Sequence, residues 1–511
     1  MRTWLARVAR EWPWGIAIVA ILSLFWIPRL VRFGSLATDA ERREIDLLRH
    51  EVDGGDATAA EARLDAFVLR HPRSPLRVEA SLLLARATIA RGRAGRYPGA
   101  AALVRAWAIL MKAPRTPEYA ALRFETATLM DEYGLPREAL DRLGLLYGER
   151  RDPEVALEMA RTLVHRAAQE PEFRNALLDE AATRVSDALR VAPPGGRLAG
   201  IRVQARVLRE ARRDEDLLSL LSSELTETRN PADRGLLQLE RGRTFARLGR
   251  NMEALASLDE AERLISDPLL RGMALVHQAE LFVRAENPEG VELCKRLQAS
   301  DSPAAPFALI VLGASELKAR PASALERLRK GYAQIRRPRV LEDAGFESAW
   351  ILSALRAALE RDADPDRLLS AAGVYGELVR LHPQSIRLGF DHGALLLRAR
   401  RFEEAADRFL ATGDSGRAEP DAKERAVLAA ADACVEGGLY RRAATLYRDY
   451  YNLRPAANTA GLFHRAVSLK KSGDATAALE GFEDYLLKAG PAGSFAGPAL
   501  LEKASLQSAA G

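Results

Sequence analysis

Residues 391–409 read DHGALLLRARRFEEAADRF, and residues 431–450 read ADACVEGGLYRRAATLYRDY. Each stretch predicts two short helices joined by a tight turn, because small residues recur where two helices would touch. Large rings recur where the space between helices must be filled. The small pairs are Gly393 with Ala405 and Ala431 with Ala443, and the rings are Phe402, Phe409, Tyr440 and Tyr447.

Regularly spaced prolines indicate that this unit repeats along most of the chain. A proline cannot continue a helix, so a regular row of prolines predicts the joints between helical hairpins. The row consists of Pro72, Pro114, Pro153, Pro193, Pro231, Pro268, Pro303, Pro338, Pro383, Pro420, Pro455 and Pro491. A second set falls midway, where the second helix of each pair would start. It consists of Pro98, Pro136, Pro288, Pro321 and Pro365.

Together, these patterns resemble the tetratricopeptide repeat (TPR) family, whose units are about 34 residues long. The resemblance implies an all-α fold, an α-solenoid of about 12 hairpins over residues 39–491. Residues 153–193 and 338–383 predict helices but no clean small-residue pair. Residues 498–511 predict a capping helix that packs through Leu500 and Leu501 and covers the last apolar face.

The N-terminus predicts a membrane anchor. Residues 1–13 form a short basic tail, and residues 14–27 read WGIAIVAILSLFWI. With its extension to residue 33, this segment reaches the lower limit of a transmembrane helix and is interpreted as a signal anchor. Two alternatives stay open: a signal peptide cleaved near Ser35-Leu36-Ala37, or a helix lying in the interface. A short tail before one apolar segment favours the tail inside and the repeats outside.

A second, narrower resemblance concerns the compartment. Residues 69–80 read LRHPRSPLRVEA. This joint is similar to one in bacterial envelope TPR proteins of the outer-membrane-assembly and Tol–Pal kind, although His71 and Leu76 stand where aromatic residues are usual. The resemblance implies a bacterial envelope compartment. Together with the anchor and its orientation, it predicts a single-pass inner-membrane protein whose repeat domain lies in the periplasm.

No motif predicts catalytic, cofactor-binding or metal-binding residues. The seven histidines are scattered, and no phosphate loop or nucleophile elbow occurs. Cys294 and Cys434 lie among apolar neighbours and are expected to be buried free thiols. The carboxylates of Asp131 and Glu132 are interpreted as a solvated helix face. With 75 basic and 70 acidic residues interleaved, the chain shows no basic stripe of the kind that binds nucleic acid.

The resemblance implies a concave groove lined by the first helix of each hairpin. Matching its positions residue by residue predicts a basic partner-binding groove for peptide or helix segments. The residues are Arg243, Arg247, Arg284, Arg387, Phe390, Arg398, Phe463, Lys470 and Lys471. The leading hypothesis is therefore a membrane-tethered, non-enzymatic scaffold that binds envelope proteins and no small-molecule substrate. The alternatives are the superhelical framework of a cell-wall enzyme system and a cytosol-facing regulatory adaptor.

Overall fold

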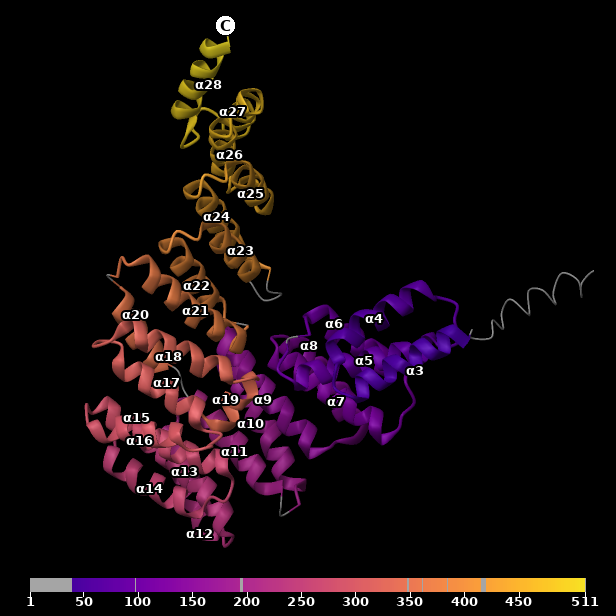
Figure 1. The fold of residues 1–511 in the computed structure, drawn as a ribbon, viewed down its shortest axis with the longest axis vertical. Helices are drawn as coiled ribbons and strands as arrows, with labels where there is room; N and C mark the ends of the chain where they lie inside the picture. The colour runs from indigo at the N-terminus through magenta and orange to yellow at the C-terminus, as the bar shows by residue number, and fades with distance from the viewer. Residues whose placement is uncertain are drawn as a thin grey trace, which may run out of the picture. The chain divides into compact units, whose positions relative to one another are not determined.

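The computed structural model describes residues 39–510, except 97, 194–195, 347–348, 361, 384 and 415–419. The described chain consists of helices joined by short turns, with no strand among these residues (Figure 1). The all-α prediction is therefore confirmed. The transmembrane helix predicted at residues 14–33 lies outside the described residues. Among the helices that are described, none combines the length and the apolar character that a membrane crossing requires.

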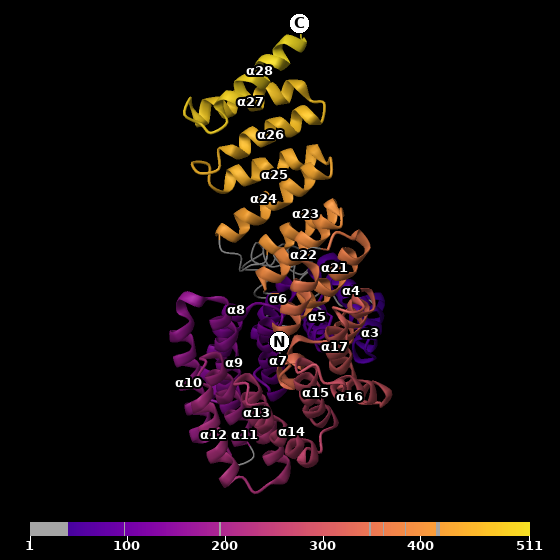
Figure 2. The same ribbon diagram turned by 90° about the vertical axis from the view of Figure 1, so that its left-hand side faces the viewer.

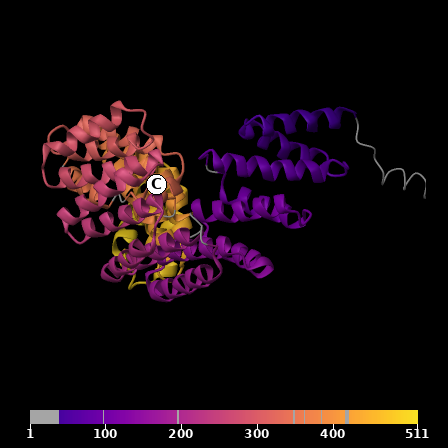
Figure 3. The ribbon, with the colours of Figure 1, turned by 90° about the horizontal axis from the view of Figure 1, so that it is seen from below.

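The helices fall into two compact units, the first ending at Met130 and the second beginning at Asp131. The first contains α3 (Asp39–Asp53), α4 (Ala57–Arg70), α5 (Arg77–Arg93), α6 (Ala100–Lys112) and most of α7 (Pro117–Glu132). Figure 3 shows its helices side by side. Leu48, Leu64 and Phe67 are fully buried between α3, α4 and α5, so the apolar stripe of each helix is covered by its neighbours.

The second unit carries the longer stack. Its helices are α8 (Pro136–Arg150), α9 (Pro153–Gln169), α10 (Arg174–Val191), α11 (Arg197–Glu210), α12 (Asp214–Glu227), α13 (Pro231–Arg247), α14 (Asn251–Leu264), α15 (Pro268–Arg284), α16 (Pro288–Ala299), α17 (Ala305–Glu316), α18 (Pro321–Gln334), α19 (Pro338–Ala344), α20 (Ala349–Leu359), α21 (Pro365–Leu381), α22 (Ile386–Arg398), α23 (Phe402–Gly413), α24 (Pro420–Glu436), α25 (Tyr440–Leu453), α26 (Ala460–Lys471), α27 (Ala475–Ala489) and α28 (Ala496–Ala510). A 3-10 turn, Pro171–Phe173, joins α9 to α10. Figure 2 shows the stack curving between α9 and α17.

In the second set, Pro136, Pro288, Pro321 and Pro365 begin helices as predicted, whereas Pro98 lies two residues before α6. In the first row, which predicts the joints between hairpins, several prolines also begin helices. Pro153, Pro231 and Pro268 are the first residues of α9, α13 and α15, where a missing N–H costs nothing. The residue before each one is Asp or Asn, and its side chain accepts a hydrogen bond from a backbone N–H of the first turn. The same Asx-Pro arrangement starts α16 and α21 within hairpins. The sequence therefore encodes the helix starts locally.

Several turns inside hairpins have one residue in the left-handed region. Gly249, Gly438 and Gly473 occupy it with φ of 74°, 73° and 86°. Arg212 and Arg400 take the same conformation, with φ of 57° and 58°, in hairpins that lack the glycine. The turn geometry is therefore kept even where its sequence signal is absent.

The predicted small-residue contacts occur within hairpins. A Cβ at Gly242 of α13 would fall 2.8 Å from Leu258 of α14, and one at Gly393 of α22 would fall 2.5 Å from the ring of Phe409. Their partners Ala254 and Ala405 are fully buried. These glycines let two helices approach more closely than a larger residue would permit.

Three further local predictions can be compared with the structure. Residues 153–193 form an ordinary pair, α9 packed on α10, although no small-residue signature marks it. The prediction that Leu500 and Leu501 pack the last helix is wrong, because they are 57% and 75% exposed; Ala496 and Ala499 of α28 are buried instead. Cys294 and Cys434 are buried free thiols, as expected.

Candidate functional site: the inner face and an edge groove

The joint between α18 and α20 is enlarged. Residues 335–346, here called the insert, contain α19 in place of the short joints seen elsewhere, such as residues 265–267 between α14 and α15. The insert does not continue the stack. Its helix α19 contacts α15, and Phe346 packs edge-on against Phe307 of α17 with ring centroids 5.2 Å apart. The insert therefore lies against the first helices of several hairpins.

The insert also reaches Arg243 of α13. A Cβ at Gly345 would fall 1.9 Å from Nη1 of Arg243, so this guanidinium lies directly against the Gly345 backbone. Gly345 has φ of 65°, a conformation that glycine adopts without strain. The surface formed by α9, α13, α15 and α17 toward the insert is called the inner face below. It corresponds to the first-helix surface that the TPR resemblance predicted as the groove.

Arg337 forms a bidentate ion pair with Glu132, the last residue of α7. Its Nε and Nη2 donate to Oε1 and Oε2 at 3.0 and 2.6 Å, and the Arg339 backbone N–H donates to Oε1 at 3.3 Å. Glu132 is only 6% exposed. Paired parallel hydrogen bonds of this kind fix both geometry and charge. The hydrogen bonds that Arg337 donates to Glu132 raise the pKa of Arg337, although burial opposes this.

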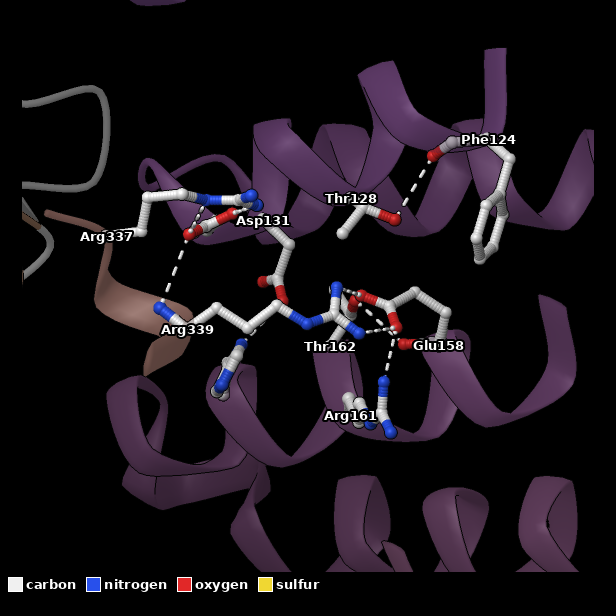
Figure 4. Close-up of polar contacts among 10 residues, drawn as sticks. Phe124, Thr128, Asp131, Glu158, Arg161, Thr162, Arg337 and Arg339 are labelled. Carbon is white, nitrogen blue, oxygen red and sulfur yellow. Dashed lines mark hydrogen bonds and ion pairs between the residues drawn. The ribbon is translucent and has the colours of Figure 1, made fainter. Parts of the chain in front are cut away.

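Arg339 makes the matching contact with Glu158 of α9. Its Nη1 and Nη2 donate to Oε1 and Oε2 at 3.1 and 3.0 Å, while Arg161 donates to the same carboxylate at 3.0 Å (Figure 4). Glu158 is 4% exposed. Two buried carboxylates thus hold two arginines that are separated by Pro338. These two contacts join residues that lie 205 and 181 positions apart in the sequence.

Neighbouring residues complete this polar centre. Asp131 pairs with Nδ1 of His165 on α9. Burial, followed by the charge of Glu132, raises the pKa of Tyr133 to about 12. The interpretation of Asp131 and Glu132 as a solvated helix face is wrong, because both are buried: Asp131 lies against His165, and Glu132 pairs with Arg337 of the insert. Among the described residues, no group of His, Cys, Asp and Glu is placed to hold a metal ion.

A second buried charge cluster lies on the inner face at Glu240 of α13. Arg243 donates to both of its oxygens at 3.0 Å, and Arg209 of α11 donates to Oε2. Burial opposes ionisation of Glu240, but the charges of Arg243, Arg209 and Arg202 outweigh it and lower its pKa to about 2. Glu240 is therefore ionised at neutral pH in spite of its burial.

Several of the nominated groove residues are engaged within the fold. Arg243 is 7% exposed in the cluster just described. Arg247 contacts Asp214 at 3.5 Å. Arg398 donates to the carbonyls of Leu359 and Asp362 at 2.9 and 2.5 Å, and so caps the end of α20. Lys470 pairs with Glu502. Their positive charges serve contacts between helices.

The other nominated residues are scattered over the second unit. Phe463 is 8% exposed and stacks on Phe495 with centroids 4.6 Å apart. Phe390 is half-buried against Phe409, and Lys471 lies 5.6 Å from the ring centroid of Tyr440. Arg387 is exposed. The structure does not bring these residues together with Arg284 into one surface.

Arg284 lines an edge groove of about 1070 Å³. The groove lies between the turn joining α15 to α16, the turn joining α17 to α18, and α20. Its apolar lining is Val283, Val291, Ala314, Leu317, Trp350, Ala354, Ala357 and Ala358. Its volume exceeds the usual range for small-molecule pockets, and two turns and a helix give it the form of a trough.

The charges along the edge groove are unbalanced. Lys318 and Arg320 are exposed, and neither has an ion-pair partner among the residues that the structure describes. Arg284 is half exposed, and its ion pair with Glu280 is long, with 3.7 Å between Nη1 and Oε1. By contrast, the carboxylates of Glu316 and Asp362 are already paired with Arg327 and Arg367. Although Glu286 is also exposed at the rim, the rim as a whole is basic.

The sequence reasoning missed Glu132, Glu158, Arg337 and Arg339. One signal was available: Arg336-Arg337-Pro338-Arg339 lies in a stretch that lacks the hairpin signature. The carboxylates gave no such signal, since acidic residues occur on every helix.

Two solved structures show a distant similarity to this chain. The crystal structure of yeast Tom70 aligns with a TM-score of 0.29 and 12% identity, covering 91% of this chain and 95% of that one. An IFIT1 monomeric mutant with m7Gppp-AAAA aligns with a TM-score of 0.33 and 16% identity, covering 78% and 89%. No family model matches the sequence, and no curated protein matches it either.

Proposed function

We propose that this chain is a membrane-tethered helical-repeat scaffold that binds protein partners in the bacterial cell envelope. The observation that carries the binding proposal is the edge groove, with its apolar floor and basic rim. Grooves of this form accept an amphipathic helix, whose apolar side chains fill the floor. Carboxylates on the partner would meet Arg284, Lys318 and Arg320. The occupant is therefore a protein segment with both acidic and apolar residues.

The groove also explains which contacts would contribute most to binding. Trp350 and the small side chains of Ala354 and Ala358 offer an apolar surface that a partner would remove from water. Exposed charges at a rim mainly steer association and select the partner. The carboxylates of Glu316 and Asp362 would repel an acidic segment less than unpaired carboxylates would, since Arg327 and Arg367 offset their charges.

A photo-crosslinking amino acid at Ala357, an exposed residue of the groove, is expected to capture protein partners in cells. Replacing Arg284, Lys318 and Arg320 together by Glu should reduce capture by about tenfold or more, because each carboxylate on the partner then meets a like charge. Crosslinked products would be quantified on gels after purification of the chain.

The matched control is the replacement of Arg229, Arg263 and Arg296 by Glu, which changes the net charge equally at exposed sites away from the groove. It should leave capture unchanged. Equal losses with both triple variants would show that only overall charge matters. Undiminished capture by the groove variant would contradict the assignment of the groove.

The tether is proposed from the apolar segment at residues 14–33. The full chain is expected to remain with membranes through a high-salt wash and to be released by detergent, whereas a variant lacking residues 1–37 should be released without detergent. Sedimentation of both forms, in cells and with protein-free vesicles, measures this. A truncated form that still sediments with protein-free vesicles would refute the tether. A full-length product that is soluble and starts after Ala37 would favour a cleaved signal peptide.

A further inference from the structure

The insert contacts the inner face in the way that a bound peptide contacts a receptor. Over residues 337–346 it meets Glu132, Glu158, α13, α15 and α17 in turn. These helices are first helices of hairpins, whereas Arg380 of α21, a second helix, donates to the carbonyls of Ile335 and Arg336 at the start of the insert. The contacts of the insert combine two charged anchors at one end with an aromatic anchor, Phe346, at the other. Charged and aromatic anchors separated by weaker contacts are typical of peptide recognition.

The two acidic anchors are built for guanidinium groups. Glu132 and Glu158 each present both oxygens to one arginine, a geometry that a lysine ammonium cannot match. Both carboxylates are more than nine-tenths buried. A buried carboxylate without a cation is strongly unfavourable. Arg161 also pairs with Glu158, so the need for an arginine from the insert or from a partner is greatest at Glu132.

The arginines are less buried than their acceptors. The side chains of Arg337 and Arg339 are each 27% exposed, compared with 4% and 5% for the side chains of Glu132 and Glu158. The two arginine side chains of the insert are therefore partly open to solvent, whereas its apolar residues Leu341, Ala344 and Phe346 are buried. A short helix within an enlarged joint can leave the inner face without unstacking its neighbours, because α18 packs directly against α21 and α17 against α20.

We propose that Glu132 and Glu158 form a binding site for a protein segment that carries two arginines separated by one residue and followed by apolar residues. The insert occupies this site as an internal ligand, and a partner segment competes with it. Because the insert is part of the same chain, its effective concentration is high and a free segment binds weakly until the insert is displaced. This site is separate from the edge groove, and it stands or falls independently of the tethering and groove proposals.

The test uses a labelled peptide with the sequence of residues 335–346 and the full chain in detergent. Fluorescence anisotropy is expected to show binding to Arg337→Ala/Arg339→Ala that is at least about tenfold tighter than binding to the unmodified chain, since the internal competitor is weakened. Adding Glu132→Gln and Glu158→Gln to that variant should abolish binding. A peptide with both arginines replaced by glutamine should not bind to any form.

Arg367→Ala is the matched control, because Arg367 also pairs with two carboxylates, Asp362 and Asp364, but lies outside the insert. It should bind the peptide no better than the unmodified chain. Far-UV circular dichroism establishes that each variant is folded. A folded Arg337→Ala/Arg339→Ala variant with no gain in affinity overturns the proposal, as does binding that survives loss of both carboxylates.

A second measurement needs no variant. Excess peptide added to the unmodified chain is expected to speed hydrogen exchange in residues 335–346 while α18 and α21 stay protected. The glutamine peptide should have no such effect. If saturating peptide left the rate of hydrogen exchange in the insert unchanged, the proposal would be overturned even if the variants failed to fold.

Discussion

Glu240→Gln is expected to lower the free energy of unfolding by about 3 kcal/mol at pH 7. The ionised carboxylate holds Arg243 and Arg209 in the interior, and its pKa of about 2 in the folded chain lies below the ordinary value of 4.5. Glutamine keeps the shape but removes the charge, leaving two buried guanidinium groups less compensated. Urea unfolding followed by circular dichroism measures the difference.

The pH dependence identifies the cause of this effect. Because the folded pKa is lowered, the stabilisation by Glu240 is fully present above pH 4.5 and is lost as the pH falls toward about 2. The difference between the two proteins should therefore be constant from about pH 8 to 5 and should shrink below about 4.5. If the difference in unfolding free energy between the two proteins were unchanged at about pH 3, its cause would be packing instead of the charge of Glu240. Glu253→Gln, at an exposed ion pair with Arg250, should leave the unfolding midpoint unchanged.

Gly290→Val is expected to destabilise the second unit by about 3 kcal/mol. A Cβ at Gly290 of α16 would fall 2.7 Å from the carbonyl oxygen of Ala279 and 2.8 Å from the backbone nitrogen of Val283, both on α15. Backbone atoms of a packed helix cannot turn aside as a flexible side chain can, so the two helices must separate.

The matched control is Gly148→Ala in α8, where a Cβ would have no neighbour within 4 Å. Alanine should stabilise this exposed helical position by about 0.5–1 kcal/mol. Urea unfolding of both variants, with hydrogen exchange to locate the change, checks the prediction. Unchanged stability of the Gly290 variant would show that α15 and α16 can separate at little cost.

The hairpins could be predicted because their signals are local. Pro153 and Pro231 begin helices after an Asx cap, Gly249 ends one in the left-handed region, and Gly242 admits Leu258 of the facing helix. Each signal acts within one hairpin, so a single sequence is enough to reveal it.

The inner face could not be predicted, because its occupant comes from a distant part of the chain. Nothing near Glu132 in the sequence indicates that Arg337 will cover it. Because arginine is abundant in this sequence, the sequence alone does not distinguish arginines that bind a partner from those that stabilise the fold. Arg398 caps α20, and Arg380 donates to the carbonyls of Tyr332 and Ile335 at the end of α18. These arginines resemble ligand-binding ones in sequence, but they satisfy helix ends.

The contacts of Arg337 and Arg339 have a consequence for how the chain folds. In an open solenoid each repeat touches only its neighbours, so folding can start anywhere and spread. Two ion pairs that join residues 205 and 181 positions apart add contacts of very high sequence separation. Such contacts form only after the intervening hairpins are in place, and they slow the final step of folding. The hairpins from α9 to α18 are therefore expected to melt as one cooperative block, and α24 to α28 to unfold from the C-terminal end.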